Sequence, residues 1–392
     1  MAEIAGLVLV WLAAFACRTT IVSIGPLLPV FLKQLGLSGF WGGSLTALPL
    51  LIIAAVSIPS GWIADRVGQR SALAAALGVL TMGCVVPAII GPTTAALFIN
   101  VTLSGLGVGL AQPTLAKVAR VVNPRNPTLP TTLYANGLVT GGLGASLLAI
   151  PLYNHLDHQW PLVFLAWGLL IGTTGIGWRF LKTRLELRSV ESTISLPATA
   201  RPRGLYAIAA SFAAQGAVFY ALVTWLPEYY VRLGWTLQHA SILVAFLSLG
   251  SITGGVASPW LLKIGRGFRT PFMILSVTIA ASGAGLALFP VLSYLWASLA
   301  GASTAAVFTL GLAAPAVLSA SNTVGRDSGR LLTIGFFGAV AGPLGFGSLF
   351  GTSAPGAMLL VAVIGLTVGL AALTLPSRLG NPVTTPRSAA NS

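Results

Sequence analysis

The sequence predicts an all-α membrane protein with twelve membrane-spanning helices, and three observations lead to this fold class. Of the 392 residues, 55% are hydrophobic and only 7% are charged, too few to cover a water-soluble protein of this length. The apolar residues fall into runs of roughly 20, the length that crosses a bilayer as a helix. Lysine and arginine gather in every second loop between these runs.

Clusters of charge and groups of glycine, proline and asparagine separate the apolar runs. Each run is expected to be helical, because a helix pairs its own backbone groups where lipid offers no partner. The least distinct boundaries are those between the third and fourth spans and between the ninth and tenth. We place the spans at residues 5–32, 42–63, 71–91, 94–118, 131–153, 160–181, 205–230, 239–262, 271–290, 293–319, 330–352 and 356–375.

The loop charges orient the spans, because basic loops stay in the cytoplasm. Loops after odd-numbered spans hold only Lys33 and Arg232. Loops after even-numbered spans, together with the C-terminal tail, hold Arg66, Arg70, Lys117, Arg120, Arg125, Lys182, Arg184, Arg188, Arg201, Arg203, Lys263, Arg266, Arg269, Arg326, Arg330, Arg378 and Arg387. We therefore expect a multi-pass protein of a bacterial inner membrane, with both termini in the cytoplasm.

The longest polar stretch divides the chain into two groups of six spans. We expect an N-terminal bundle over residues 1–181, a cytoplasmic linker over 182–204, a C-terminal bundle over 205–375 and a cytoplasmic tail over 376–392. We expect the protein to be a monomer.

Short matches between the two groups indicate an internal duplication. Leu28-Pro29, followed by Leu35-Gly36, recurs as Leu226-Pro227 followed by Leu233-Gly234. In the next span of each group, Pro59 and Arg66 recur as Pro259 and Arg266, so the offsets are 198 and 200 residues. Because six is even, the repeats run in the same direction through the membrane, which predicts a substrate path between them near the midplane.

Composition and spacing exclude several other classes of function. The net charge of +14 lies in short loops and not on one face of a domain, which argues against nucleic-acid binding. Cys17 and Cys84 lie inside apolar runs, so neither a disulfide framework nor a cysteine metal site is expected. His155, His158 and His239 lie near the outer edge, and no phosphate-binding loop or nucleophile–histidine–acid set is present. We expect no enzyme activity, metal or cofactor.

The loop after the second span reads Gly-Trp-Ile-Ala-Asp-Arg-Val-Gly-Gln-Arg over residues 61–70. It resembles the major facilitator signature Gly-x-x-x-Asp-Arg-x-Gly-Arg-Arg/Lys, with glutamine at position 69. This resemblance implies two parallel six-helix bundles that rock around a central site, with a cytoplasmic latch. The latch residues would be Gly61, Asp65, Arg66, Gly68 and Arg70. A solvated charge cluster at a helix end is the alternative interpretation.

A narrower resemblance rests on four further motifs. Arg18 precedes Ser-Ile-Gly-Pro-Leu-Leu-Pro at residues 23–29, and span 2 contains Leu-Thr-Ala-Leu-Pro at 45–49. Span 5 contains Gly-Gly-Leu-Gly-Ala at 141–145, and span 7 ends in Trp-Leu-Pro at 225–227. These segments resemble the cyanate and 2-nitroimidazole transporter (CynX/NimT) family. The resemblance implies a small anion or a nitro-bearing solute as substrate.

Arg18 is the strongest candidate for a substrate ligand. It lies 13 residues after Ala5 and 15 before Lys33, near the bilayer centre, where an arginine costs about 2.5–3.5 kcal/mol on insertion scales. None of the seven acidic residues lies mid-span, so its counter-ion is expected to be the substrate. The forked guanidinium suits planar oxyanions and nitro groups. The alternative is a structural arginine bonded to carbonyls near Pro26 and Pro29.

Further candidates are polar or aromatic residues in the middle of spans that line or flank the path in this fold. Amide and hydroxyl groups can bond a solute, and phenyl rings can wall a flat one. Helix packing, lipid contact and interhelical hydrogen bonds are the alternative roles for them. These candidates are Thr46, Asn100, Asn136, Gln215, Phe219, Tyr220, Phe308 and Phe336.

The function predicted from these residues is secondary active or facilitated transport of a small, cyanate-like anion or nitro-bearing solute by alternating access. The lipid bilayer and the solute are the expected partners. A buried carboxylate relay is not expected, but a proton that travels with the anion remains open, and Glu228 is the carboxylate to test. The alternative is an exporter of small neutral or aromatic compounds.

Overall fold

The computed structural model describes residues 2–122, 128–180, 204–265, 267–318 and 324–375. These residues form thirteen α-helices and one short 3-10 helix, and the predicted linker and tail lie almost wholly outside them. The elements are α1 (Ala2–Val22), α2 (Ile24–Leu35), α3 (Gly39–Val67), α4 (Gln69–Ile90), α5 (Thr94–Val122), α6 (Thr128–His155), α7 (Trp160–Phe180), α8 (Leu205–Arg232), α9 (Leu237–Ile264), α10 (Arg269–Leu288), η1 (Pro290–Leu292), α11 (Ser293–Leu318), α12 (Val324–Phe350) and α13 (Ala354–Leu373).

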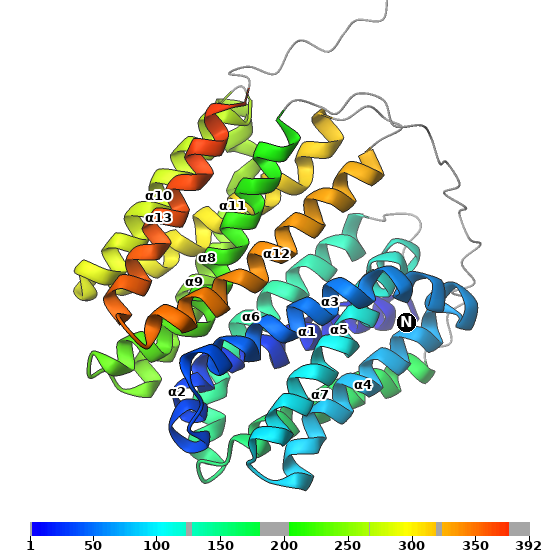
Figure 1. The fold of residues 1–392 in the computed structure, drawn as a ribbon. Coiled ribbons are helices and arrows are strands. Elements are labelled where there is room, and N and C mark those ends of the chain that lie inside the picture. Colours follow the sequence, from blue (N-terminus) through cyan, green and yellow to red (C-terminus); the bar gives the residue numbers. More distant parts are fainter. Residues whose placement is uncertain (1, 123–127, 181–203, 266, 319–323, 376–392) are drawn as a thin grey trace, which may run out of the picture.

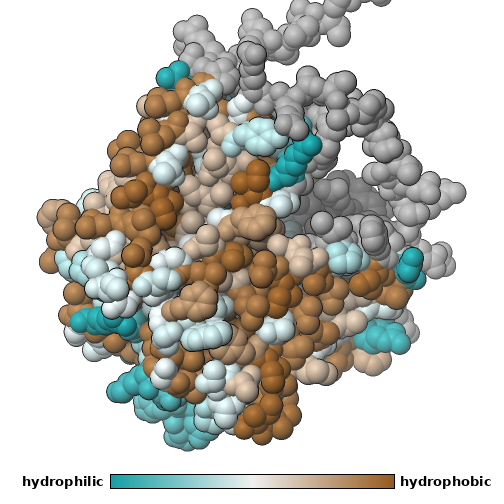
Figure 2. All heavy atoms as spheres, in the orientation of Figure 1, coloured by the Kyte–Doolittle hydropathy of each residue, from teal (hydrophilic) through white to brown (hydrophobic). Residues whose placement is uncertain are grey.

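Twelve segments of the described chain are long and apolar enough to cross a membrane. This confirms the predicted all-α membrane fold, including the two least distinct boundaries: a turn follows Ile90, and η1 separates α10 from α11. Apolar residues cover most of the visible helix sides in Figure 2, while hydrophilic residues gather toward the rims of that view. The chain is thus a multi-pass membrane protein.

The first span contains a break that the sequence analysis did not predict. It runs from Ile4 to Leu35, but α1 ends at Val22 and α2 begins at Ile24. Ser23 still donates its N–H to the Thr19 carbonyl, over 3.1 Å. Pro26 has no N–H to offer the Val22 carbonyl four residues earlier, and its ring crowds that carbonyl. The break therefore lies one turn beyond Arg18, deep in the membrane.

The helices form two groups, α1–α7 and α8–α13, which lie side by side in Figure 1. Both groups contain the same kind of close helix crossing. A Cβ added at Gly141 of α6 would overlap the Phe15 carbonyl of α1, and one added at Gly338 of α12 would overlap the Ala213 carbonyl of α8. Phe15 and Ala213 are 198 residues apart, the offset of the Leu-Pro repeat. The duplicated sequence is therefore accompanied by duplicated packing.

The two groups meet through the helix pairs α2–α8, α3–α12 and α6–α9. At their closest approaches, backbone contacts backbone. A Cβ added at Gly25 would overlap the Val223 carbonyl oxygen, and a Cβ added at Gly39 would overlap the Gly347 carbonyl oxygen. Ser241 of α9 also donates to the Pro26 carbonyl, over 3.4 Å. We call this end of the molecule, where α2 and the start of α3 meet α8, α9 and the end of α12, the sealed end.

The aromatic residues at the end of α8 do not form the interfacial belt that their span-end position suggests. Trp225 and Tyr230 are fully buried, and Tyr229 is 2% exposed. The Tyr230 hydroxyl donates to the Leu286 carbonyl, over 3.0 Å. Pro290 stands four residues after Leu286 and cannot supply the helical N–H. These rings pack inside the second group of helices instead of facing lipid.

Candidate functional site

Arg18 of α1 lies between the two groups of helices and reaches across to the second. Its Nη1 donates a hydrogen bond to the Tyr220 hydroxyl of α8, over 3.0 Å. Arg18 is partly exposed, while its neighbours Cys17 and Thr19 are completely buried. Among the described residues, no carboxylate forms an ion pair with Arg18. The hydrogen bond that its guanidinium makes within this part of the chain is the one to Tyr220. The guanidinium therefore has donors left for a solute.

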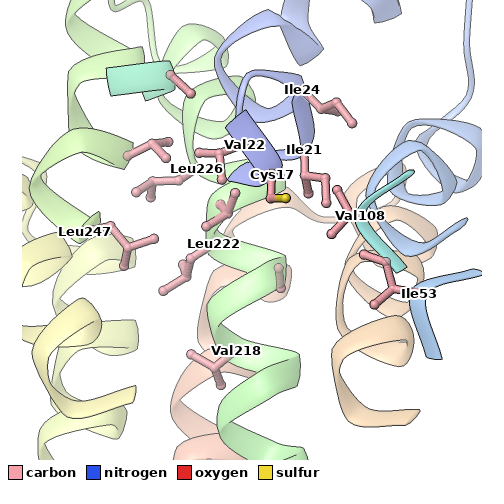
Figure 3. Close-up of a cluster of buried hydrophobic side chains, with 14 of the residues drawn as sticks. Cys17, Ile21, Val22, Ile24, Ile53, Val108, Val218, Leu222, Leu226 and Leu247 are labelled. Carbon is pink, nitrogen blue, oxygen red and sulfur yellow. The ribbon is translucent and has the colours of Figure 1, made fainter. Parts of the chain in front are cut away.

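The buried side chains near the break lie on two different faces of α1. Figure 3 shows Cys17 and Ile21 directed toward Val108 of α5, while Val22 lies on the opposite side, toward Leu226 of α8. All of these side chains are buried, and Cys17 and Cys84 are free thiols. One face of α1 thus packs within its own group, and another meets the second group.

Two aromatic residues lie on the same face of α1 as Arg18. Trp11 and Phe15 precede it by seven and three residues, the spacing of one helix face, and their ring centroids are 5.3 Å apart. Trp11 donates its indole N–H to Asn136 of α6, over 2.9 Å. Asn136 is exposed, so its amide N–H groups stay accessible. The sequence analysis missed both rings, although their spacing from Arg18 could have revealed them.

Tyr134 of α6 is a third residue that the sequence analysis missed. It is partly buried and lies within electrostatic range of Arg18. Arg18 is thus flanked by two phenols, one from each group of helices. No spacing in the sequence relates Tyr134 to Arg18, because the proximity arises from the packing of α6 on α1.

Other predicted residues gather on α8 and the helices beside it. Phe219 packs edge-on against Tyr220, with ring centroids 5.3 Å apart. Phe308 of α11 is 42% exposed and stacks on Phe212 of α8, at 5.1 Å. Gln215 is 5% exposed on α8, and Phe336 of α12 is partly buried against the core.

Asn100 and Thr46 occupy different surroundings. Asn100 is fully buried between α5 and α4 and donates to the Gly83 carbonyl, over 2.8 Å. Pro87 stands four residues after Gly83, so that carbonyl has no helical N–H partner, and the Asn100 amide replaces it. Thr46 of α3 is also fully buried, and its hydroxyl finds no hydrogen-bond partner within the described part of the chain. The structure therefore brings together Arg18, Tyr220 and Phe219, but gives Asn100 a partner within the first group.

Comparison with known proteins places this architecture. The sequence profile of the Major Facilitator Superfamily matches residues 10–324. The chain belongs to the major facilitator superfamily. It is 26% identical over 300 residues to the cyanate transport protein CynX of Escherichia coli, covering 75% of this chain and 76% of that protein.

Two further relatives of this major facilitator protein are transporters. The 2-nitroimidazole transporter of Escherichia coli is 24% identical, with 87% of this chain and 86% of that protein covered. The gentisate transporter of Corynebacterium glutamicum is 27% identical, with 87% and 80% covered. A bacterial homologue of the lysosomal transporter Spinster, solved in an inward-facing conformation, matches 95% of this chain and 97% of its own with a TM-score of 0.76 at 16% identity. The chain is therefore a transporter and not an enzyme.

The predicted latch of this major facilitator protein is only partly described, because the surroundings of Gly61 and of the Asp65 side chain lie outside what the structure describes. Gly68 joins α3 to α4 at a φ of 83°, a conformation that favours glycine. Arg66 is exposed. Arg70 donates to the carbonyls of Trp178, over 2.9 Å, and Arg179, in the last turn of α7. A cation suits that helix end, so Arg70 joins α4 to α7 within the first group.

Two carboxylates at span ends are buried and not solvated. Glu228 of α8 is 7% exposed and accepts a bond from the Arg232 guanidinium, over 2.7 Å. Arg232 also donates to the Phe350 carbonyl at the end of α12, over 3.4 Å, and lies over the Phe350 ring. Asp327 of α12 is 1% exposed and lies 3.5 Å from Arg330. Both ion pairs lie within the second group of helices.

Proposed function

We propose that this protein moves a small anion or a nitro-bearing solute across the bacterial inner membrane by alternating access, with Arg18 as the substrate anchor. The observation that carries the proposal is the bond from Arg18 to the neutral Tyr220 across the two groups of helices. A mid-membrane cation that meets a phenol, with no carboxylate pair among the described residues, can take its counter-charge from the solute. The relatives named for cyanate, 2-nitroimidazole and gentisate agree with this class of solute.

The proposal includes an orientation and a division of the chain. The loops at the sealed end carry only Lys33 and Arg232, so the positive-inside rule puts that end outside the cell and both termini in the cytoplasm. The sealed contacts then describe a monomer closed to the outside. Residues 1–181 and 205–375 are the two moving bundles, and residues 182–204 connect them.

The test is uptake and binding in variants of Arg18. We expect Arg18→Ala to abolish binding of the transported anion and Arg18→Lys to weaken it, because lysine keeps the charge but loses the fork. The control is Arg179→Ala, which removes an exposed cation at the end of α7. Thermal melting shows that each variant is folded. Wild-type uptake and binding in folded Arg18→Ala would rule out the anchor.

The alternative is export of small neutral or aromatic compounds, and one observation favours it. The stacked pair of Phe308 and Phe212 leaves Phe308 half-exposed, as a wall for a flat apolar solute would be. An exporter of this kind would move its solute independently of Arg18. Anion transport would depend on Arg18, and also on the membrane potential where no proton travels with the anion.

A further inference from the structure

The contact between Arg18 and Tyr220 leaves two donors side by side. The Tyr220 oxygen accepts the bond from Arg18 Nη1, so the phenol still has its own proton to donate. The two donor atoms are 3.0 Å apart, and both can reach a solute that lies against them. Phe219 packs edge-on on the Tyr220 ring and limits its rotation. The contact therefore places two kinds of hydrogen-bond donor next to each other.

The two donors come from positions that the internal duplication does not repeat. At the 198-residue offset, Arg18 corresponds to Gly216 and Tyr220 corresponds to Val22. Each group of helices thus supplies a different donor. The corresponding positions, Gly216 and Val22, carry no donor side chain, so the duplication does not produce a second pair. A solute that engages both donors contacts both groups of helices at the same time.

We propose that the recognised part of the cargo is a planar group with two oxygens on one atom, a carboxylate or a nitro group. One oxygen accepts from the Arg18 guanidinium and the other from the Tyr220 hydroxyl. This rests on the proposed function and names its substrate class. Gentisate carries a carboxylate and 2-nitroimidazole a nitro group, whereas linear cyanate presents a single terminal atom to the pair. Tyr220 is therefore the residue that separates these solutes from cyanate.

The experiment compares three probes on the purified full-length protein: benzoate, 2-nitroimidazole and cyanate. Tyr220→Phe keeps the ring but removes the hydroxyl, which is both the proposed donor to the solute and the acceptor of the Arg18 bond. We expect its Kd to rise about tenfold for benzoate and about fivefold for 2-nitroimidazole, the loss of one hydrogen bond to a charged or a neutral acceptor. The Kd for cyanate should change less than about twofold, because cyanate keeps its bond to Arg18. Tyr206→Phe, a half-exposed tyrosine on the same helix, is the matched control and should change none of the three.

Cyanate binding serves as the internal check that Tyr220→Phe is folded. An equal change for cyanate and benzoate, or no change in either, would overturn the inference. If Arg18→Ala abolishes binding of both while Tyr220→Phe alters neither, the anchor stands and only the two-oxygen rule fails. If Arg18→Ala leaves all three bound as in wild type, or if the wild-type protein binds none of them, the proposed function fails and the inference with it.

Discussion

At the scale of the residue, the structure distinguishes two kinds of polar residue. Some lie at the interface between the two groups of helices, and others donate to backbone carbonyls that a proline leaves without a partner. Arg18 and Tyr220 bond each other across the two groups of helices. Asn100 instead completes the hydrogen bonding of α4, whose ladder is interrupted by Pro87. Both kinds of residue look alike in a sequence, since each is a single polar residue within an apolar run.

The Asn100 contact gives a first prediction. Asn100→Ala leaves the buried Gly83 carbonyl without a donor, so the folded state should lose roughly 1 kcal/mol. Thermal melting in detergent measures this loss, and the Kd for the anion should stay at its wild-type value. Ser104→Ala is the control and should not destabilise the protein. Ser104 lies on the same helix as Asn100, and its buried hydroxyl has no hydrogen-bond partner among the described residues. A lower anion affinity in Asn100→Ala would instead show that Asn100 contacts the solute.

Glu228 gives a second prediction at this scale. Its carboxylate accepts from Arg232 within the second group, and no contact joins it to Arg18 among the described residues. We expect Glu228→Gln to leave the pH dependence of uptake unchanged, because the carboxylate serves Arg232 and not a proton path. Uptake in vesicles across a range of external pH tests this. A pH profile that becomes flat in Glu228→Gln would assign it a coupling role.

The sequence predicts the depth of Arg18 in the membrane, because depth follows from counting residues between span ends. It could not show that Tyr220 is its partner, nor that Tyr134 lies near it, because those relations depend on how α8 and α6 pack on α1. It could not show either that the Trp225 ring, at the end of a span, is buried between helices. Position along a span predicts depth, but not which face of the helix carries the side chain.

At the scale of the element, the broken first span and α8 cross at equivalent positions of the two repeats. Gly25 and Val223 are 198 residues apart, and each precedes a proline by four residues. Pro29 and Pro227 lack N–H groups, so the carbonyls of Gly25 and Val223 have no helical partner. The Val223 carbonyl lies against Gly25, where any side chain would overlap it. The repeated Leu-Pro motif thus marks the crossing point of the sealed end.

This crossing gives a third prediction. Gly25→Ala should disfavour the sealed state, since the added Cβ and the Val223 carbonyl cannot occupy the same space. A cysteine introduced at Ser44, near the start of α3, should then react faster with a maleimide added from outside. Gly142→Ala is the matched control, because its Cβ would make only ordinary contacts, with Val22 of its own group and with Ser248 of α9 across the interface. Equal labelling in Gly25→Ala and wild type would remove Gly25 from the seal.

At the scale of the whole molecule, the twelve spans, the duplication and the superfamily were all predictable from sequence. They rest on properties summed over many residues: hydropathy, loop charge and a repeated motif. The sealed end was not predictable, because it depends on a few backbone contacts between segments far apart in the sequence, which leave no periodic pattern. The break at Ser23 was not predicted either, although its local cause, Pro26, stands in the sequence.

The fourth prediction concerns orientation. Gln238 and Lys263 are exposed at opposite ends of α9. A membrane-impermeant maleimide added to intact cells should label Gln238→Cys and should not label Lys263→Cys until the membrane is opened. The native Cys17 and Cys84 are buried and add little background. The reverse labelling pattern would put the sealed end in the cytoplasm.

The sealed end has a consequence for how its opening is controlled. Its described contacts join glycine backbones, a serine hydroxyl and carbonyl groups, and none of those contacts involves a titratable side chain. Because these contacts depend on shape and not on charge, protons, metal ions and dissolved salt should act on them only weakly. Its opening should respond instead to forces that squeeze helices together, so bilayer thickness and lateral pressure are expected to set how often the protein opens on this side.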